Sequence, residues 1–179
     1  MPLTPIHSSI AYLVRALGHR LSLPALLVST MAPDLEIPFT YLATGGQYSR
    51  LALHSFLGAA TLATALSVVL TVFAYAPVVS HVFKLEYGTL SARCRFSWSL
   101  VGVCLLGTFT HVLIDAFHHE YNPLFFPFSL DSVDALVFLN DWTLASAIVS
   151  LLFFSLLLFF VVREIRRGAE NFWSRVLVE

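Results

Sequence analysis

Three long runs of this chain contain no Asp, Glu, Lys or Arg, and they limit the possible folds more than any other feature. They cover residues 51–83, 96–114 and 142–162. A helix needs roughly 20 apolar residues to cross about 30 Å of hydrocarbon, and each run meets or approaches that length. The first run is longer than necessary, so we expect it to tilt or to emerge near Pro77. The sequence therefore predicts three full transmembrane helices.

The composition of the chain agrees with this prediction. Of the 179 residues, 58% are hydrophobic and only 12% are charged, whereas a soluble domain usually has about 25% charged residues. We expect an all-α integral membrane protein with one domain over residues 1–179. The net charge of -1 and the lack of a basic stripe give no indication of a nucleic-acid partner. No secretory signal peptide is visible, so we expect the first residues to be retained.

The first 50 residues follow a different pattern. Residues 6–14 and 21–31 are apolar, but a polar stretch that includes Arg15, His19 and Arg20 separates them. Each piece would make a helix of roughly 15 Å, which is too short to cross a bilayer. We expect two short helices in a re-entrant hairpin that the rest of the protein covers. The alternative is one extra span from Leu21 through Pro33, preceded by an amphipathic helix.

Within the single domain, residues 1–50 thus form the hairpin and a loop, and residues 51–179 form the three-helix core with a basic C-terminal tail. Charge is distributed unevenly about this core. Nine of the ten basic residues fall on one side, which the positive-inside rule assigns to the cytoplasm: Arg15, Arg20, Lys84, Arg93, Arg95, Arg163, Arg166, Arg167 and Arg175. Seven of the eleven acidic residues fall on the outer side: Asp34, Glu36, Asp115, Glu120, Asp131, Asp134 and Asp141. We therefore predict a cytoplasmic C-terminus.

Five residues that bind metals well lie at membrane-buried or membrane-edge positions, namely His7, Asp34, His54, His111 and Asp115. Under the predicted topology each lies at the outer end of its segment, so we expect all five to converge there. His111 and Asp115 are four residues apart on one predicted helix, which places both side chains on one face. An ionisable side chain inside a bilayer is costly and marks a functional site by default.

The residue types indicate a divalent metal. Imidazole and carboxylate ligands suit zinc, and a catalytic zinc usually keeps three protein ligands and an open water position. Manganese or iron is compatible with the same ligands. One or two ions fit five candidate ligands, and Asp34, on a tight turn, is the natural bridge. Glu36, His118, His119 and Glu120 are candidates for extra ligands, for orienting ligands or for a general base. The candidate catalytic residues are thus Asp34, Glu36 and Glu120.

Simpler interpretations of the same residues stay open. His7 and His54 could be interfacial polar residues, and Asp34 could begin a turn after a proline. A structural hydrogen bond between His111 and Asp115 would not need a metal. The alternative functions are accordingly a non-catalytic metal-binding or transport protein and a structural membrane protein.

Four short motifs carry a resemblance to a known family. They are Thr4-Pro-Ile-His7, Ser29-Thr-Met-Ala-Pro-Asp34-Leu-Glu36, His54-Ser55 and Gly107-Thr-Phe-Thr-His111-Val-Leu-Ile-Asp115. In this order they resemble the membrane-bound metal-dependent hydrolases of bacteria and archaea, which include LexA-regulated inner-membrane proteins. The resemblance covers about residues 1–125 and implies hydrolase activity in the cytoplasmic (inner) membrane.

The ligand order is also similar to that of the zinc-dependent phospholipase C and single-strand nuclease superfamily. That resemblance implies phosphoester hydrolysis in an all-helical fold, with His7, Asp34, His54, His111 and Asp115 as ligands. The chain departs from the pattern because it lacks a free N-terminal tryptophan and a second pair of the His-x-x-x-Glu type, which puts a third metal in doubt. We expect a metal-dependent hydrolase that acts at the outer interface on a phosphoester of a lipid or a lipid-linked carrier. The oligomeric state is not predicted.

Overall fold

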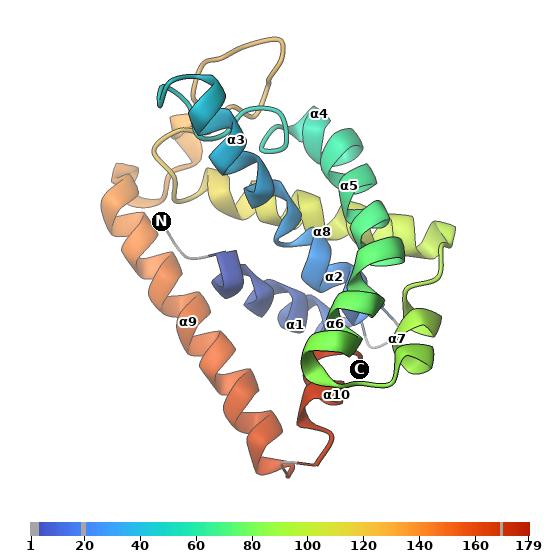
Figure 1. Ribbon diagram of the computed structural model, residues 1–179. Coiled ribbons are helices and arrows are strands. Elements are labelled where there is room, and N and C mark those ends of the chain that lie inside the picture. The colour runs from blue at the N-terminus through green and yellow to red at the C-terminus, as the bar shows by residue number, and fades with distance from the viewer. Residues whose placement is uncertain (1–3, 19–20, 169) are drawn as a thin grey trace.

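The computed structural model describes residues 4–18, 21–168 and 170–179. This part of the chain folds into helices and contains no strand (Figure 1). Three helices are long and apolar enough to cross a membrane, at Phe56–Phe83, Trp98–Ala116 and Trp142–Arg166. The prediction of an all-helical chain with three such helices is confirmed.

The N-terminal region contains two separate short helices. A 3-10 turn at Thr4–His7 leads into α1 (Ser8–Leu17), and α2 covers Leu23–Ser29. The Ser22 hydroxyl caps α2 by accepting the Ala25 amide at 3.4 Å. The single long helix considered as the alternative does not form, because a 3-10 turn at Ala32–Leu35 follows α2. His19 and Arg20, which the sequence placed between the two helices, lie outside the described residues.

The helix α2 lies in the middle of the bundle and packs most closely on α8 (Trp98–Ala116) (Figure 1). Its side chains from Leu23 to Leu27 are buried. The approach of α2 to α8 depends on Gly107, because a Cβ atom there would lie 1.9 Å from the Ser29 hydroxyl. Such irregular short helices are tolerated at membrane depth only when protein surrounds them.

The first long helix begins at Phe56, later than the predicted residue 51. The hydroxyl of Ser55 caps it by accepting the Gly58 amide at 2.9 Å. The helix comprises α4 (Phe56–Gly58), α5 (Thr64–Val69) and α6 (Ala76–Phe83), joined by π-helical turns at Ala59–Ala63 and Leu70–Tyr75. The helix continues through Pro77 to Phe83. The second π-helical turn immediately precedes this proline, which has no amide hydrogen to donate.

The other helices complete the bundle. A short α3 (Glu36–Ala43) leads to the first long helix, and α7 (Tyr87–Arg93) leads to α8. Two 3-10 turns, at Asp134–Leu136 and Phe138–Asn140, precede α9 (Trp142–Arg166), which packs on α1. The last helix is α10 (Phe172–Leu177). The helix α9 ends four residues after the predicted Val162, because Glu164 lies buried among arginines that neutralise it.

Successive helices of the bundle run in alternating directions. Their ends therefore lie near one end of α9 or the other. Trp142 at its start lines a cavity together with His119, which follows α8. Arg163, near its end, lines another cavity together with Arg15 and Arg93. Arg163 lies 21 positions after Trp142 on the same helix, so the two residues are about 30 Å apart.

The close contact of α2 with α8 predicts that Gly107→Ala destabilises the protein. The added methyl group would overlap Ser29 and push the helices apart, at a cost of about 1–3 kcal/mol. Gly102→Ala is the matched control, since a Cβ at this α8 position meets nothing within 4 Å. Thermal unfolding of the purified proteins should show a lower Tm for G107A and a wild-type Tm for G102A. Equal Tm values would contradict the packing.

Candidate metal centre

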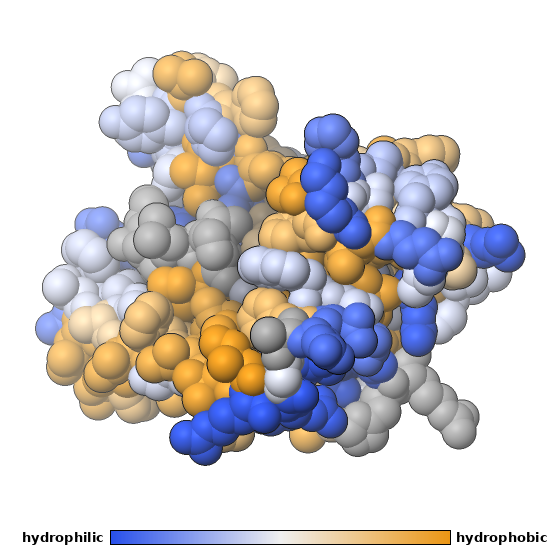
Figure 2. All heavy atoms as spheres, turned by 60° about the horizontal axis from the view of Figure 1, so that its bottom comes forward, coloured by the Kyte–Doolittle hydropathy of each residue, from blue (hydrophilic) through white to orange (hydrophobic). Residues whose placement is uncertain are grey.

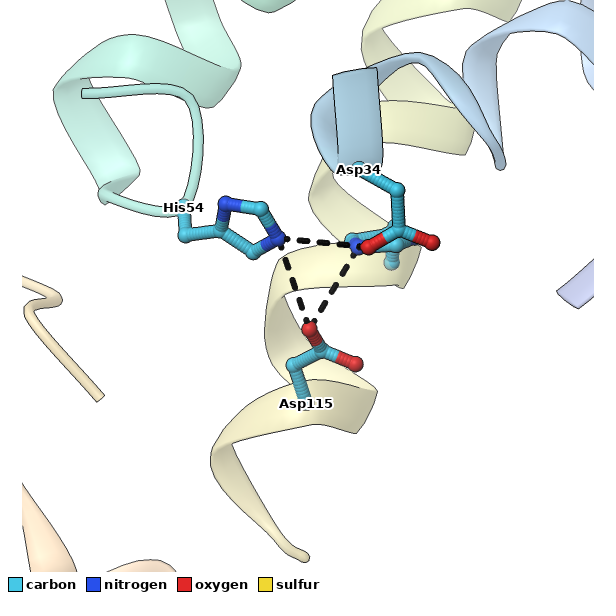
Figure 3. A group of neighbouring side chains, drawn as sticks. Asp34, His54 and Asp115 are labelled. Atoms are coloured by element: carbon cyan, nitrogen blue, oxygen red, sulfur yellow. Dashed lines mark ion pairs between the residues drawn. The ribbon is translucent and has the colours of Figure 1, made fainter. Parts of the chain in front are cut away.

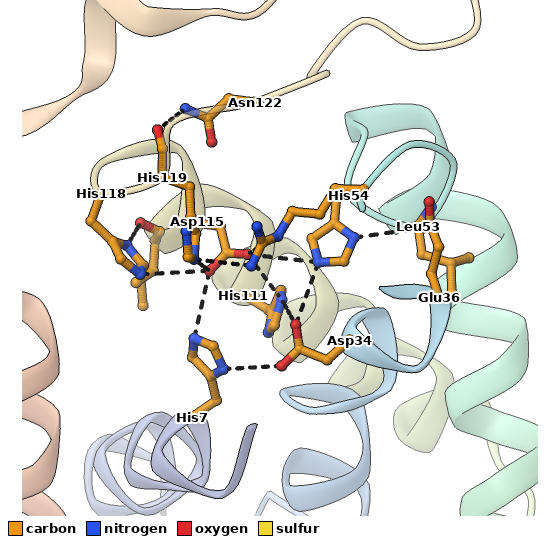
Figure 4. A network of polar contacts seen from close by, with 12 residues as sticks. His7, Asp34, Glu36, Leu53, His54, His111, Asp115, His118, His119 and Asn122 are labelled. Carbon is orange, nitrogen blue, oxygen red and sulfur yellow. Dashed lines mark hydrogen bonds and ion pairs between the residues drawn. The ribbon is translucent and has the colours of Figure 1, made fainter. Parts of the chain in front are cut away.

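Four histidines and two aspartates from separate segments meet at one end of the bundle (Figure 4). His7 ends the first 3-10 turn, Asp34 lies on the turn after α2, and His54 precedes the first long helix. His111 and Asp115 lie on the last turns of α8, and His118 follows them. All six side chains are buried. The structure thus brings together the five residues that the sequence placed at the outer ends of their segments.

The first group comprises Asp34, His54, His111 and Asp115, whose ligand atoms all lie within 4.8 Å of one another. The His54 Nε2 atom lies 3.5 Å from Asp34 Oδ1 and 3.7 Å from Asp115 Oδ2 (Figure 3). The His111 Nε2 atom lies 3.5 and 3.4 Å from the same two oxygens. Ligands at 2.0–2.1 Å from a tetrahedral zinc are separated by roughly 3.3–3.4 Å. The four atoms therefore have nearly the spacing of a tetrahedral zinc site.

The second group comprises His7, Asp115 and His118. The Asp115 Oδ1 atom lies 3.5 Å from His7 Nε2 and 4.0 Å from His118 Nε2. Asp115 belongs to both groups and presents a different oxygen to each, which would allow its carboxylate to join two ions. The sequence favoured Asp34 as the bridge. Asp34 also touches both groups, because its Oδ2 atom lies 3.3 Å from His7 Nδ1.

Whether these residues fit a cation can be judged from the buried polar atoms that have no hydrogen-bond partner. Within the described part of the chain, the Nε2 atoms of His7, His54, His111 and His118 and both Asp115 oxygens form no hydrogen bond. Buried polar atoms are normally paired, since leaving one unpaired costs about 1–3 kcal/mol. Here the unpaired nitrogen and oxygen atoms point at one another across 3.4–4.0 Å. A divalent ion would satisfy all of them, so the residues fit a metal.

Backbone carbonyl groups orient two of the histidines. The Nδ1 atom of His111 donates to the Thr30 carbonyl at 2.8 Å, and that of His118 donates to the Ile114 carbonyl at 2.8 Å. Each bond leaves the Nε2 lone pair available for a metal, as is usual for metal-binding histidines. Thr30 directly follows Ser29, which contacts Gly107, so the helix packing positions this carbonyl.

Glu36 supports His54. Its carboxylate accepts the backbone amides of Leu51 and Leu53, and its Oε2 atom lies 3.6 Å from His54 Nδ1. These contacts hold the loop before the first long helix and orient the imidazole. Backbone and His54 hydrogen bonds outweigh burial and lower the pKa of Glu36, which stays ionised. The structure thus places Glu36 next to a candidate ligand and not at an open position.

Arg50 is the site residue that sequence reasoning missed. Its side chain is 5% exposed, which is unusual for an arginine. The Nε atom lies 3.5 Å from Asp115 Oδ2, and Nη2 lies 3.3 Å from His119 Nε2. Nine basic residues lie on the predicted cytoplasmic side, and Arg50 is the tenth, on the outer side. Nothing in its sequence position distinguishes it from a surface arginine.

A cavity of about 360 Å³ lies beside the site, and Arg50 and His119 line it. Glu120 also lines this cavity, but its side chain is exposed. His119 lies deeper, with its Nε2 atom 3.3 Å from Asp115 Oδ1. The cavity continues between the loop after α8 and the start of α9, where Trp142, Ser146 and Ser150 line it. Arg50 and His119 thus contact both the cavity and Asp115 of the buried groups.

His7 and His118 differ in their affinity for protons. Burial by itself lowers the pKa of His7, but the carboxylates of Asp115 and Asp34 outweigh it and raise this pKa to about 9. Burial and the neighbouring His119 lower the pKa of His118 to about 4. His118 is therefore a neutral ligand at pH 7, whereas a cation that binds beside His7 has to displace a proton.

A family model described as a domain of unknown function, DUF4184, matches residues 1–177. The chain belongs to this family. The DUF4184 match includes every residue of the two groups, and the family description assigns no chemistry to them. No curated protein and no solved structure matches the chain.

The shared carboxylate predicts how metal content changes in variants. Wild-type protein purified in detergent and loaded with zinc should hold about two ions per chain, His118→Ala about one, and Asp115→Ala almost none. His81→Ala, at an exposed position of α6, is the matched control and should keep the wild-type content. Elemental analysis measures all four proteins. Wild-type metal content in D115A would show that this carboxylate is not a ligand.

Proposed function

We propose that this member of the DUF4184 family is a membrane-embedded, metal-dependent hydrolase that acts on a phosphoester of a lipid or a lipid-linked substrate. One observation carries the proposal. A three-ligand group, His7, Asp115 and His118, shares its carboxylate with a four-ligand group beside it. Three protein ligands leave a position for water, which is the usual difference between a catalytic and a structural zinc site.

Zinc is the favoured metal, because the ligands are imidazole nitrogens and carboxylate oxygens at nearly tetrahedral spacing. Manganese or iron would suit the same residues. When bound, such an ion supplies Lewis acidity and a hydrolytic nucleophile at neutral pH. The motif resemblance to membrane-bound metal-dependent hydrolases agrees with this proposal.

Arg50 supports a phosphoester as the substrate. Arg50 lines the cavity and its Nε atom lies 3.5 Å from Asp115 Oδ2, so a phosphate group in the cavity would meet a cation that also contacts the metal centre. Arginine binds phosphate through paired hydrogen bonds and neutralises charge that develops during phosphoryl transfer. His119, also in the cavity wall, accepts a hydrogen bond from Arg50 at 3.3 Å and would act as a positioning residue for the guanidinium group. Glu36 would act through His54 as a positioning residue.

A lipid or lipid-linked substrate is favoured by the surroundings of the site. In the most apolar stretch of α9 only 17% of the residues are buried within the protein, so most of this helix would face lipid. The cavity opens beside the first turns of this helix, near Trp142. Tryptophan is common at the level of lipid headgroups. A substrate could therefore enter from the membrane interface.

The proposed enzyme predicts that Arg50→Gln lowers kcat/KM by roughly 100-fold, as loss of one charge-stabilising group does in other enzymes. Arg50→Lys should keep part of the activity, since lysine retains the charge but not the paired hydrogen bonds. The assay uses zinc-loaded protein with p-nitrophenyl phosphate, bis(p-nitrophenyl) phosphate and phospholipid substrates. Asp131→Asn, at an exposed loop position, is the control.

Measured zinc content separates a catalytic effect of Arg50 from loss of the site. Activity that falls in R50Q while zinc content stays normal would support the role. Zinc-loaded wild-type protein with no phosphoesterase activity on any of these substrates would contradict it and favour a structural metal site.

The membrane proposal includes an orientation in the inner membrane of a bacterium or archaeon, with the metal centre facing outward. It follows from the arginines that gather at the other end of the bundle. A fluorescent protein fused after residue 179 should therefore fluoresce in the cytoplasm of Escherichia coli. An alkaline phosphatase fused at residue 130, in the loop between α8 and α9, should be active outside. The opposite pair of results would reverse the orientation.

A further inference from the structure

A second cavity lies at the end of the bundle away from the metal centre. Its volume is about 740 Å³, within the range of small-molecule sites. It is formed by α1, α7, the last turns of α9 and α10 (Figure 1). In the view of Figure 2, which brings this end forward, hydrophilic residues gather next to hydrophobic ones. None of the residues that bind the candidate metal lines this cavity.

The lining of this cavity has an excess of positive charge. Five arginines line it against two glutamates: Arg15, Arg93, Arg163, Arg167, Arg175, Glu164 and Glu179. Three of the arginines share the one carboxylate of Glu164, at 2.8–3.2 Å. Arg15 donates to the Glu179 backbone oxygen at 2.6 Å, and no ion pair of Arg93 is found among the described residues. Burial and the positive charge of Arg93 lower the pKa of Arg15.

The positive-inside rule explains why arginines gather on one side, but not why they converge on a cavity. These five come from four helical segments distant in sequence. The hydroxyl groups of Thr89 and Ser174 line the same cavity and can add neutral hydrogen bonds. Guanidinium groups of arginine, together with nearby hydroxyl groups, are donors that commonly bind phosphate oxygens.

An apolar groove of about 640 Å³ adjoins this cavity and shares Arg163 and Arg167 with it. Leu158, Phe159 and Val162 of α9 line the groove. The arginine cavity and the groove therefore lie side by side along the end of α9, with Arg163 and Arg167 between the charged lining and the apolar one. This order matches a molecule that carries a phosphate group on an acyl chain.

We propose that the arginine cavity binds a phosphate group of net negative charge, as in the headgroup of an anionic phospholipid whose acyl chain lies along α9. This site is independent of the metal centre and of the hydrolase proposed above. Arg93 would bind the phosphate, because Glu164 already neutralises much of the charge of three of the other arginines, and Arg15 donates to the backbone oxygens of Glu179 and Gly18.

The test is calorimetric titration of the full chain in an uncharged detergent with dihexanoyl phosphatidylglycerol. Binding should saturate, and Arg93→Gln should weaken it roughly tenfold, as loss of a charge-assisted hydrogen bond does. Arg95→Gln is the matched control: it removes the same charge two residues away, at an exposed position that lines neither cavity. Both variants should keep the wild-type Tm, which shows that they fold.

Two further probes identify the source of the phosphate. Dihexanoyl phosphatidylcholine, which has no net charge, should bind much more weakly. Inorganic phosphate that binds as tightly as the anionic lipid, with the same loss in R93Q, would support the site and assign it to a soluble phosphate. Equal affinities of R93Q and R95Q, or equal binding of the two lipids, would overturn the proposal.

Discussion

The burial of two aspartates in an apolar bundle is the constraint on which the rest of the structure depends. Asp34 and Asp115 are almost completely enclosed, and a buried carboxylate is tolerated only when cationic groups surround it. The compensating groups are five histidines and Arg50, and no two of the segments that carry His7, Arg50 and His111 are neighbours in sequence. The carboxylates thus fix which ends of the helices must meet. A divalent ion in either group would complete the same compensation more fully.

Much of the fold could be predicted from the sequence, because uncharged runs of spanning length have few alternatives to helices. The predicted ends of these helices were less accurate. The first helix begins at Phe56 because Ser55 caps it, and α9 continues to Arg166 because Glu164 has arginine partners. Both are effects of side-chain hydrogen bonds, which hydropathy does not report. The π-helical turns were not predicted either; the second, at Leu70–Tyr75, lies just before Pro77, whereas the first has no proline nearby.

The convergence of the candidate ligands followed from topology alone, since alternating helices bring every second end together. The roles within the site did not follow. Asp115 is common to both groups because its two oxygens face different histidines, and this depends on how the segments that carry His7 and His54 pack against α8. Glu36 has the composition of a general base, yet two backbone amides occupy its oxygens. Arg50 could not be recognised because burial, which distinguishes it from a surface arginine, is a tertiary property.

The two short N-terminal helices have a consequence for how the protein is made. The chain emerges from the ribosome with α1 and α2 first, but neither is long enough to lie across a bilayer alone. Their cover comes from α8 and α9, and α9 is the last of the long helices to be synthesised. The cover of α1 is therefore complete only after α9 has been made. A product that is truncated before α9 would lack the helix that packs on α1.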